Sequence, residues 1–225
     1  MIRFLDILFS TVAIIFLLPL FLIVSVVLAF TGENEIFYLQ ERVGKDKKVF
    51  KLFKFATMLK NSSEIGTGTI TIKNDARILP FGNLLRKSKI NELPQIFNIL
   101  MGDMSVIGPR PMTEKNFKRY HEDIQIIVAS EKPGLSGIGS IIFRDEEKLL
   151  FDANNVESFY EEVIAPFKGE LECWFSDNKS IKVYFACIFL TIYSVLIPKN
   201  SLIWRVFQDL PVPPESLLKD LNYDK

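Results

Sequence analysis

The segment from Lys89 to Pro111 carries the residue types best suited to phosphate chemistry. Asn91 and Glu92 are adjacent polar and acidic side chains, a second acid follows at Asp103, and Arg110 is fixed between two prolines. Carboxylates bind hard cations that also bridge phosphate oxygens, and a guanidinium group matches two phosphate oxygens at once. These types in this order predict a site for phosphate chemistry.

An amphipathic helix must position these groups. Its apolar residues recur at helical spacing, and Asn91, Gln95 and Asn98 share the opposite stripe; the apolar set is Ile90, Leu93, Ile96, Phe97, Leu100 and Met101. Pro94 suits a first helical turn and Gly102 a C-terminal cap, which places Asn91 and Glu92 at the helix entrance. The free N–H groups there favour anions. We expect the apolar face to pack against a core or a membrane and the polar stripe to carry the functional groups. The alternative is an amphipathic core helix without a function of its own.

The composition indicates a protein of a membrane surface. Of 225 residues 48% are hydrophobic and 20 are Phe, more than a soluble domain of this size usually needs. Lys plus Arg equals Asp plus Glu, at 27 each, so the charge gives no reason to expect nucleic acid as a partner. An apolar N-terminus precedes a local group of lysines, which predicts a membrane segment and then a surface facing anionic lipid. A solvated strand face is the alternative for Lys45, Lys47, Lys48, Lys51, Lys54 and Lys60.

The N-terminal segment from Ile7 to Phe30 has no charged residue. As a helix it would measure roughly 36 Å, long enough to span a bilayer. Pro19 lies within it, and an interior proline frees one carbonyl group and bends the helix. Ser10 or Thr11 could donate a hydrogen bond to that carbonyl. A signal peptide is disfavoured because no cleavage pattern follows. Spanning and re-entrant arrangements both remain open on these residues alone.

The middle of the chain is predicted to be a compact α+β unit that is mainly helical. Ile36–Gln40 and Val49–Phe55 are expected to be short strands, and Thr67–Lys73 alternates small or polar with apolar residues. From Asn83 onward the pattern is mostly helical. We expect this small β-hairpin region to support the site.

The apolar run Val183–Ile197 is too short for a comfortable membrane span. We expect an interfacial helix near residues 181–198, with Tyr193 and Trp204 at headgroup depth; a buried core helix is the alternative. The Pro-rich stretch Leu210–Ser216 leads into a C-terminal tail, residues 211–225, that we expect to be poorly ordered.

Cysteine and histidine usage excludes several classes of site. Cys173 and Cys187 lack paired metal-ligand spacing and lie in apolar contexts, so we expect buried, reduced thiols. His121 is the only histidine and stands in a charged stretch. A zinc cluster and a Ser-His triad are therefore disfavoured.

Five motifs in order resemble the bacterial sugar transferases of the monotopic phosphoglycosyl transferase family. They are "ERVGK" (Glu41 to Lys45), "FKLFKFATM" (Phe50 to Met58), "NELPQIFNILMGDMSVIGPRP" (Asn91 to Pro111), "KPGLSG" (Lys132 to Gly137) and "ECWFSDNKS" (Glu172 to Ser180). No single string is decisive, but five in register are specific. The resemblance covers almost the whole chain.

The resemblance implies a membrane enzyme that initiates surface glycan or glycoconjugate assembly. The expected reaction transfers a sugar 1-phosphate from a UDP-sugar to undecaprenyl or another polyprenol phosphate, with Mg²⁺, and releases UMP. The expected location is the cytoplasmic face of the bacterial inner membrane. The resemblance favours a re-entrant helix over residues 1–32, with both ends in the cytoplasm, before a catalytic domain over residues 33–210. A homodimer is left open.

The same resemblance assigns roles to individual residues. Glu92 matches the acid linked to Mg²⁺, and Asn91 occupies the position of the nucleophile. Arg110, Arg144 and Lys54 match positions associated with substrate phosphates, and a structural ion pair is the alternative for Arg144 and Lys54. Asp103 falls in the family's "GDMS" motif as a supporting residue, with the same alternative.

Two positions depart from the family pattern. Asn91 stands where most relatives have aspartate, and an amide cannot form an ordinary acyl phosphate. Ala56 stands where many have arginine. Direct transfer between two bound substrates, Glu92 as nucleophile, an inactivated homologue and an engineered substitution all remain open; we favour a transferase with altered chemistry. The competing classes are a membrane-surface protein that binds nucleotide sugar or polyprenol phosphate without catalysis, and a soluble structural protein with a cleaved leader.

Overall fold

The computed structural model describes residues 1–62, 75–144, 146, 149, 156–197 and 200–223. The expected strand at 67–73 lies outside these residues. The chain divides into an N-terminal unit, Phe4–Glu41 with Lys51–Met101, and a C-terminal unit, Met1–Arg3, Arg42–Phe50 and Gly102–Lys225. The boundary between the two units crosses a two-stranded sheet.

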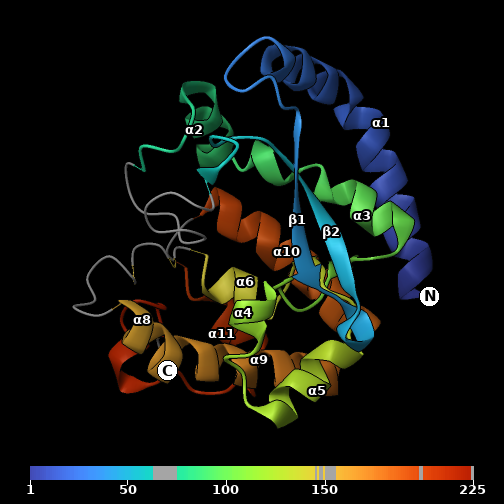
Figure 1. Ribbon diagram of the computed structural model, residues 1–225. Coiled ribbons are helices and arrows are strands. Elements are labelled where there is room, and N and C mark those ends of the chain that lie inside the picture. The colour runs from blue at the N-terminus through green and yellow to red at the C-terminus, as the bar shows by residue number, and fades with distance from the viewer. Residues whose placement is uncertain (63–74, 145, 147–148, 150–155, 198–199, 224–225) are drawn as a thin grey trace. The chain divides into compact units, whose positions relative to one another are not determined.

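The N-terminal unit combines a long apolar helix with that sheet and shorter helices (Figure 1). Its helices are α1 (Ile2–Ala29), α2 (Pro80–Lys87) and α3 (Gln95–Met101), and a 3₁₀ turn, Ile90–Glu92, precedes α3. The sheet pairs β1 (Phe37–Val43) with β2 (Val49–Phe55), and the 3₁₀ turn Lys45–Lys47 joins them. The predicted hairpin is thus confirmed, with β1 beginning one residue later and extending further than expected.

Aromatic packing forms the core of the N-terminal unit. The Phe21 ring lies 5.7 Å from that of Phe55 on β2 and 5.5 Å from that of Phe97 on α3, measured between centroids. Val24, Leu28 and Leu85 complete the buried cluster. Because these residues come from α1, α2, α3 and β2, the second half of α1 is fixed to the elements that carry Lys54 and Glu92.

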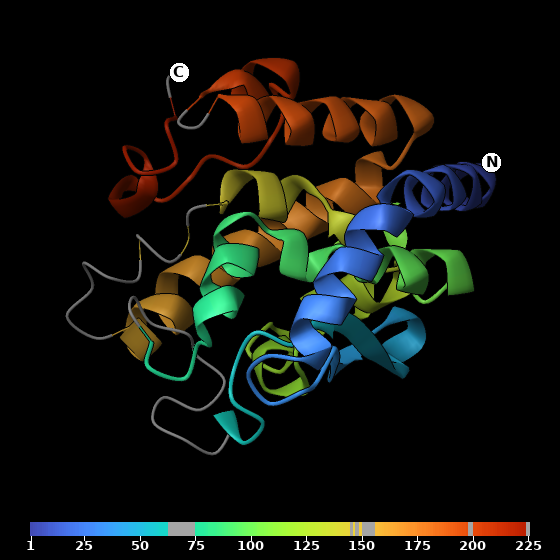
Figure 2. The ribbon, with the colours of Figure 1, turned by 90° about the horizontal axis from the view of Figure 1, so that it is seen from above.

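Helix α1 continues through Pro19 without a break in secondary structure. Figures 1 and 2 show that its axis changes direction along its length, as expected for a helix with an interior proline. Ser10 or Thr11 was expected to support the freed carbonyl; the Ser10 hydroxyl donates to the Ile7 carbonyl at 3.1 Å instead, which leaves Thr11 as the predicted donor. Among the described residues, α1 is the one helix long and apolar enough to cross a membrane. Re-entry remains a prediction.

The C-terminal unit is mainly helical around two short parallel strands. Ser105 and Ile107 of one strand are in register with Gly134 and Ser136 of the other. Its elements are β3 (Ser105–Ile107), α4 (Glu114–Phe117), α5 (Glu122–Ser130), β4 (Gly134–Ser136), α6 (Ile138–Ile142), α8 (Val156–Phe159), a π-helical turn (Tyr160–Ile164), α9 (Ala165–Asn178), α10 (Ile181–Leu196), α11 (Leu202–Val206) and a 3₁₀ turn (Glu215–Leu217). The fold class is therefore mainly helical with small sheets, as predicted.

Helix α10 has one packed face and one exposed apolar face. Tyr184, Cys187, Leu190 and Ser194 are buried. The exposed side chains on the rest of the helix and just past its end are Phe185, Phe189, Ile192, Val195, Leu196 and Ile197. An amphipathic helix was predicted here. Both cysteines are free, as expected, but only Cys187 is buried, whereas Cys173 is partly exposed.

Two predictions about the C-terminal region are wrong. Trp204 was expected at headgroup depth, but it is 1% exposed and its indole N–H donates to the Leu221 carbonyl at 3.0 Å. The tail was expected to be poorly ordered, but Leu217 and Leu221 are buried and Tyr223 packs edge-on against Trp204. Aromatic and aliphatic side chains that follow the proline-rich stretch anchor the tail by burying apolar surface. The prediction from proline content alone did not take this packing into account.

Candidate functional site

Asn91 and Glu92 lie in the 3₁₀ turn that leads into α3. Lys89, just before this turn, has a left-handed backbone with φ of 59°, and Gly102 ends α3 with φ of 102°. Glycine readily adopts the positive φ of such a helix end. The predicted cap and helix entrance are both confirmed.

Glu92 forms an ion pair with Lys54 on β2. The distance from Lys54 Nζ to Glu92 Oε1 is 3.4 Å, and both side chains are largely shielded from water. Two residues that the sequence assigned separately to metal and phosphate binding are therefore neighbours in the N-terminal unit. A cation and a carboxylate that are both partly exposed are suited to a ligand that carries phosphate and metal together.

Asn98 holds α3 against the edge of β2. Its Oδ1 accepts a hydrogen bond from the Phe53 backbone N–H at 3.0 Å, and its Nδ2 donates to the Lys51 carbonyl at 2.8 Å. The amide thus takes the place of a neighbouring strand along the part of β2 just before Lys54. Asn98 is fully buried, so both hydrogen bonds are shielded from water.

The polar stripe of α3 is buried, contrary to the prediction that it would be the working face. Asn91, Gln95 and Asn98 are 7%, 5% and 0% exposed. In contrast, Leu100 and Met101, which were expected to pack, are exposed. For Asn98 the reason is that its amide forms hydrogen bonds with β2, a partner that helical periodicity does not reveal.

Asn91 has an unusual environment. Its Oδ1 is buried and has no hydrogen-bond partner among the described residues. Leaving a buried polar atom unpaired costs about 1–3 kcal/mol, so a bound water, an ion or a ligand is needed to offset that cost. Asn91, which the resemblance places at the position of the nucleophile, therefore carries an orphaned acceptor next to Glu92.

Arg110 follows β3, in the C-terminal unit, where "GDMSVIGPRP" and "KPGLSG" pack together. The Gly134 N–H donates to the Pro109 carbonyl at 2.7 Å, and the Gly108 N–H donates to the Ser136 carbonyl at 2.9 Å. The backbones are so close that a Cβ on Gly134 would lie 2.1 Å from the Gly108 nitrogen. Glycine is required for this close approach, and the approach fixes the backbone next to Arg110. The Arg110 side chain itself is exposed to solvent.

Glu172 is a buried carboxyl group to which the sequence analysis gave no role. Its carboxylate on α9 accepts a hydrogen bond from the Arg110 backbone N–H, and its side chain is 3% exposed overall. Its Oε2 has no hydrogen-bond partner among the described residues. Burial raises the Glu172 pKa to about 7, against the hydrogen bond from Arg110 and the charges of Lys168 and Arg110, which lower it. The motif "ECWFSDNKS" contained this residue, but no local signal gave it a role.

Lys168 lies one turn before Glu172 on α9 and is also buried. Its Nζ lies 2.6 Å from Glu146 Oε1, 4.9 Å from the centroid of the Phe143 ring and 5.5 Å from that of Tyr160. Burial lowers the Lys168 pKa, against the charge of Glu146, which raises it. Burial likewise raises the Tyr160 pKa to about 12. Buried polar groups thus underlie the segment that carries Arg110.

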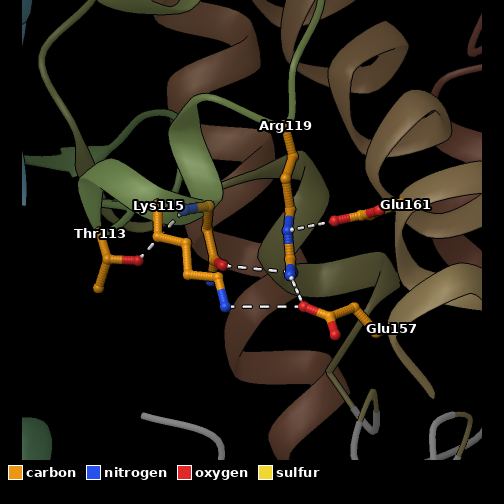
Figure 3. A network of polar contacts seen from close by, with 6 residues as sticks. Thr113, Lys115, Arg119, Glu157 and Glu161 are labelled. Carbon is orange, nitrogen blue, oxygen red and sulfur yellow. Dashed lines mark hydrogen bonds and ion pairs between the residues drawn. The ribbon is translucent and has the colours of Figure 1, made fainter.

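A second polar network ties α4 to α8 and the π-helical turn (Figure 3). The Arg119 guanidinium lies 2.9 Å from Glu157 and 3.1 Å from Glu161, and it also stacks over the Tyr160 ring at 5.2 Å. Lys115 joins Glu157 at 3.6 Å. Because Tyr160 also contacts Lys168, this network is connected to the buried ion pair of Lys168 with Glu146.

The remaining predicted site residues belong to the C-terminal unit. Asp103 is partly buried just before β3, and Arg144 is exposed in a turn after α6. Lys54, Asn91 and Glu92 form one set in the N-terminal unit; Asp103, Arg110 and Arg144 are placed in the other. Within the first set the structure brings the residues together.

The residues present fit a magnesium ion better than a metal that needs an all-protein cage. The described residues contain no group of three or more His, Cys, Asp or Glu side chains suited to a metal. Mg²⁺ is usually held by one or two carboxylates together with substrate phosphates. Glu92 would offer one carboxylate to such an ion, and Asn91 Oδ1 would offer one neutral oxygen from the same turn.

Comparisons with known proteins identify the family of the chain. The model of the family described as bacterial sugar transferase matches residues 1–198. The exopolysaccharide production protein ExoY of Rhizobium meliloti is 31% identical over 186 residues, which cover 74% of this chain and 82% of that protein. The UDP-galactose-lipid carrier transferase of Erwinia amylovora is 32% identical over 189 residues, which cover 74% of this chain and 39% of that protein. The UDP-glucose:undecaprenyl-phosphate glucose-1-phosphate transferase of Klebsiella pneumoniae is 34% identical over 140 residues, 60% and 30% of the two chains.

Proposed function

Because the chain belongs to the bacterial sugar transferase family, we propose that it transfers a sugar 1-phosphate from a UDP-sugar to undecaprenyl phosphate. Relatives named for undecaprenyl-phosphate sugar-phosphate transfer support this reaction. The sugar-bearing phosphorus of the UDP-sugar gains a bond to an oxygen of the lipid phosphate and loses its bond to the UMP oxygen. The products are a lipid diphosphate sugar and UMP.

The observation that carries this proposal is the pairing of Lys54 with Glu92 beside Asn91. The reaction brings two phosphorylated substrates together, so cationic side chains must offset their mutual repulsion. Lys54 supplies one cation within its unit, and the assignment of Arg110 and Arg144 to substrate phosphates rests on the family resemblance. Mg²⁺, held by Glu92 when bound, would neutralise charge on the diphosphate.

Asn91 determines which version of the mechanism we propose. Its amide carries no charge and its lone pair is delocalised, so it is a poor nucleophile. The lipid phosphate therefore attacks the UDP-sugar directly while both substrates are bound, and binding and orientation supply much of the rate. The buried, orphaned Oδ1 favours a role for Asn91 in holding a ligand.

We place the reaction at the cytoplasmic face of the bacterial inner membrane. Helix α1 exposes large apolar side chains such as Phe4, Ile15 and Phe16, at 68%, 66% and 80%. Water would penalise this surface and a bilayer would cover it. The exposed apolar face of α10 suits an interfacial position. The polar site residues then remain in reach of a nucleotide sugar from the aqueous phase.

The test is release of UMP by the full chain in membranes. A panel of UDP-sugars is supplied with undecaprenyl phosphate and Mg²⁺, and the same mixtures without the lipid are the control. We expect UMP and a lipid-linked sugar to form together with one or more donors. No release with any donor, while UDP-sugar still binds, would contradict catalysis.

A second candidate function is binding of nucleotide sugar or polyprenol phosphate without turnover. Asn91 favours it, and so does Ala56, which is buried and donates its N–H to the Ile36 carbonyl at 3.0 Å. This position supplies no cation. Saturable UDP-sugar binding without UMP release would favour this function over transfer.

A further inference from the structure

A polar cavity of about 350 Å³ lies at the end of α10, next to α11 and the C-terminal segment. Figure 2 shows these elements side by side. All of its lining residues except Tyr193 follow residue 198, where the match to the family model ends. The cavity therefore belongs to a part of the chain to which the shared chemistry assigns no role.

The lining of this cavity suits an anion. Arg205 and Lys219 contribute two exposed cations, and Asn200 and Ser201 add amide and hydroxyl groups. No acidic side chain is among the described residues that line it. A guanidinium and an ammonium together match the oxygens of a phosphate group.

The cavity is continuous with the exposed apolar face of α10 through one aromatic pair. The Tyr193 ring, which lines the cavity, stacks on Phe189 with 6.0 Å between centroids at an angle of 29°. Phe189 is 57% exposed and shares its face with Phe185, Ile192 and Leu196 at helical spacing. A phosphate site and an apolar surface thus adjoin on a single helix end.

We propose that this cavity binds the phosphate headgroup of an anionic membrane phospholipid whose acyl chains lie along the exposed face of α10. Charge complementarity identifies the phosphate, and the adjoining apolar face identifies a lipid as its source, since a soluble phosphate would leave that face uncovered. Such a contact would fix the depth and rotation of α10 at the membrane surface. The proposal does not depend on the transfer reaction, because lipid binding is its readout.

Native mass spectrometry of the detergent-solubilised full chain tests this proposal. Phosphatidylglycerol and phosphatidylcholine with identical acyl chains are titrated, and the fraction of protein carrying one lipid is measured. We expect phosphatidylglycerol to bind about tenfold more tightly, because the choline of phosphatidylcholine offsets the charge of its phosphate, and we expect Arg205→Ala with Lys219→Ala to remove that preference. Both residues are exposed, so thermal unfolding of the variant should match that of the wild type.

The matched control removes two exposed lysines elsewhere, Lys87→Ala with Lys182→Ala, and should keep the lipid preference. Equal binding of the two lipids, or an unchanged preference in the Arg205 and Lys219 variant, would overturn the proposal. Competition by glycerol 1-phosphate at the concentration of the lipid would also overturn it, because the cavity would then be a site for soluble phosphate.

Discussion

The Lys54 ammonium group lies 3.4 Å from the Glu92 carboxylate, although the two residues are 38 positions apart in the chain. The pair joins strand β2 to the turn that opens α3. It is the clearest link between the predicted site residues within one unit.

Glu92→Gln should leave the protein folded and lower turnover by about 100-fold, because an amide is a weaker ligand for Mg²⁺ than a carboxylate. UMP release at saturating substrate measures this turnover. In a Mg²⁺ titration, any residual activity of the variant should need a higher Mg²⁺ concentration than that of the wild type. Glu33→Gln, an exposed change in the same unit, is the control. Wild-type turnover in the Glu92 variant would mean that the site is elsewhere.

Asn98→Ala should lower the free energy of unfolding by about 2–4 kcal/mol, because two backbone groups of β2 lose their partner in a buried place. Denaturant unfolding measures the change, and Asn83→Ala, at an exposed position of α2, should stay within about 0.5 kcal/mol. Since Asn98 also fixes the strand that carries Lys54, turnover should fall in the folded fraction. A variant as stable as the wild type would refute the proposed role of this amide.

Glu172→Gln should change how stability depends on pH. Burial raises the carboxyl pKa from 4.5 to about 7, so between these values the folded protein keeps a proton that the unfolded chain has lost. The Glu172 carboxyl group therefore lowers the stability of the wild type as pH rises through that window. The glutamine variant has no titrating group at this position, so this decrease is absent. The variant should gain up to about 3 kcal/mol relative to wild type between pH 4.5 and pH 7. A pH-independent difference in unfolding free energy would contradict this.

Local pattern was sufficient to predict the helix entrance and the hairpin. Pro94 and Gly102 set the bounds of α3 through backbone preferences that any chain obeys, and the strand predicted over Val49–Phe55 has the same bounds as β2. The residues of the site were found through motifs, but their pairing was not. Nothing near Lys54 in the sequence indicates that Glu92 will be its partner.

The errors came from partners far away in the chain. The stripe of Asn91, Gln95 and Asn98 looked like a surface because polar side chains usually face water. Asn98 is buried because β2 offers an unpaired edge to its amide. Glu172 was overlooked for the same reason, since its importance arises from a backbone N–H at Arg110. Trp204 was wrongly assigned to the membrane because the local sequence does not indicate its partner. That partner, the Leu221 carbonyl, is brought to Trp204 by tertiary packing.

The arrangement of α1 is tested by cysteine accessibility. Ile2→Cys and Asn34→Cys are made one at a time in a Cys173→Ser background. Both should react with an impermeant maleimide only after the inner membrane is permeabilised, so that the reagent reaches the cytoplasm. The half-buried Cys173 is removed because it would add background, while Cys187 is buried. Labelling of residue 2 from the periplasm would show that α1 spans the membrane and would sink the re-entrant arrangement.

The Asn91 side chain offers the most direct test of mechanism. If transfer is direct, no sugar-phosphate adduct should form at residue 91 when a UDP-sugar is supplied without lipid phosphate. Initial rates with both substrates varied should give intersecting double-reciprocal lines, because the two must be bound together. Intact-protein mass spectrometry and steady-state UMP release measure these two outcomes.

Asn91→Asp separates direct transfer from loss of function. In a working direct transferase, the aspartate adds a negative charge beside Glu92 and close to the phosphates, so it should leave turnover unchanged or lower it. If instead the wild type is inert and the aspartate variant gains turnover with a covalent adduct, the asparagine is an inactivating residue and the second candidate function holds. An adduct on the wild type that maps to Glu92 would make that carboxylate the nucleophile and rule out direct attack by the lipid phosphate.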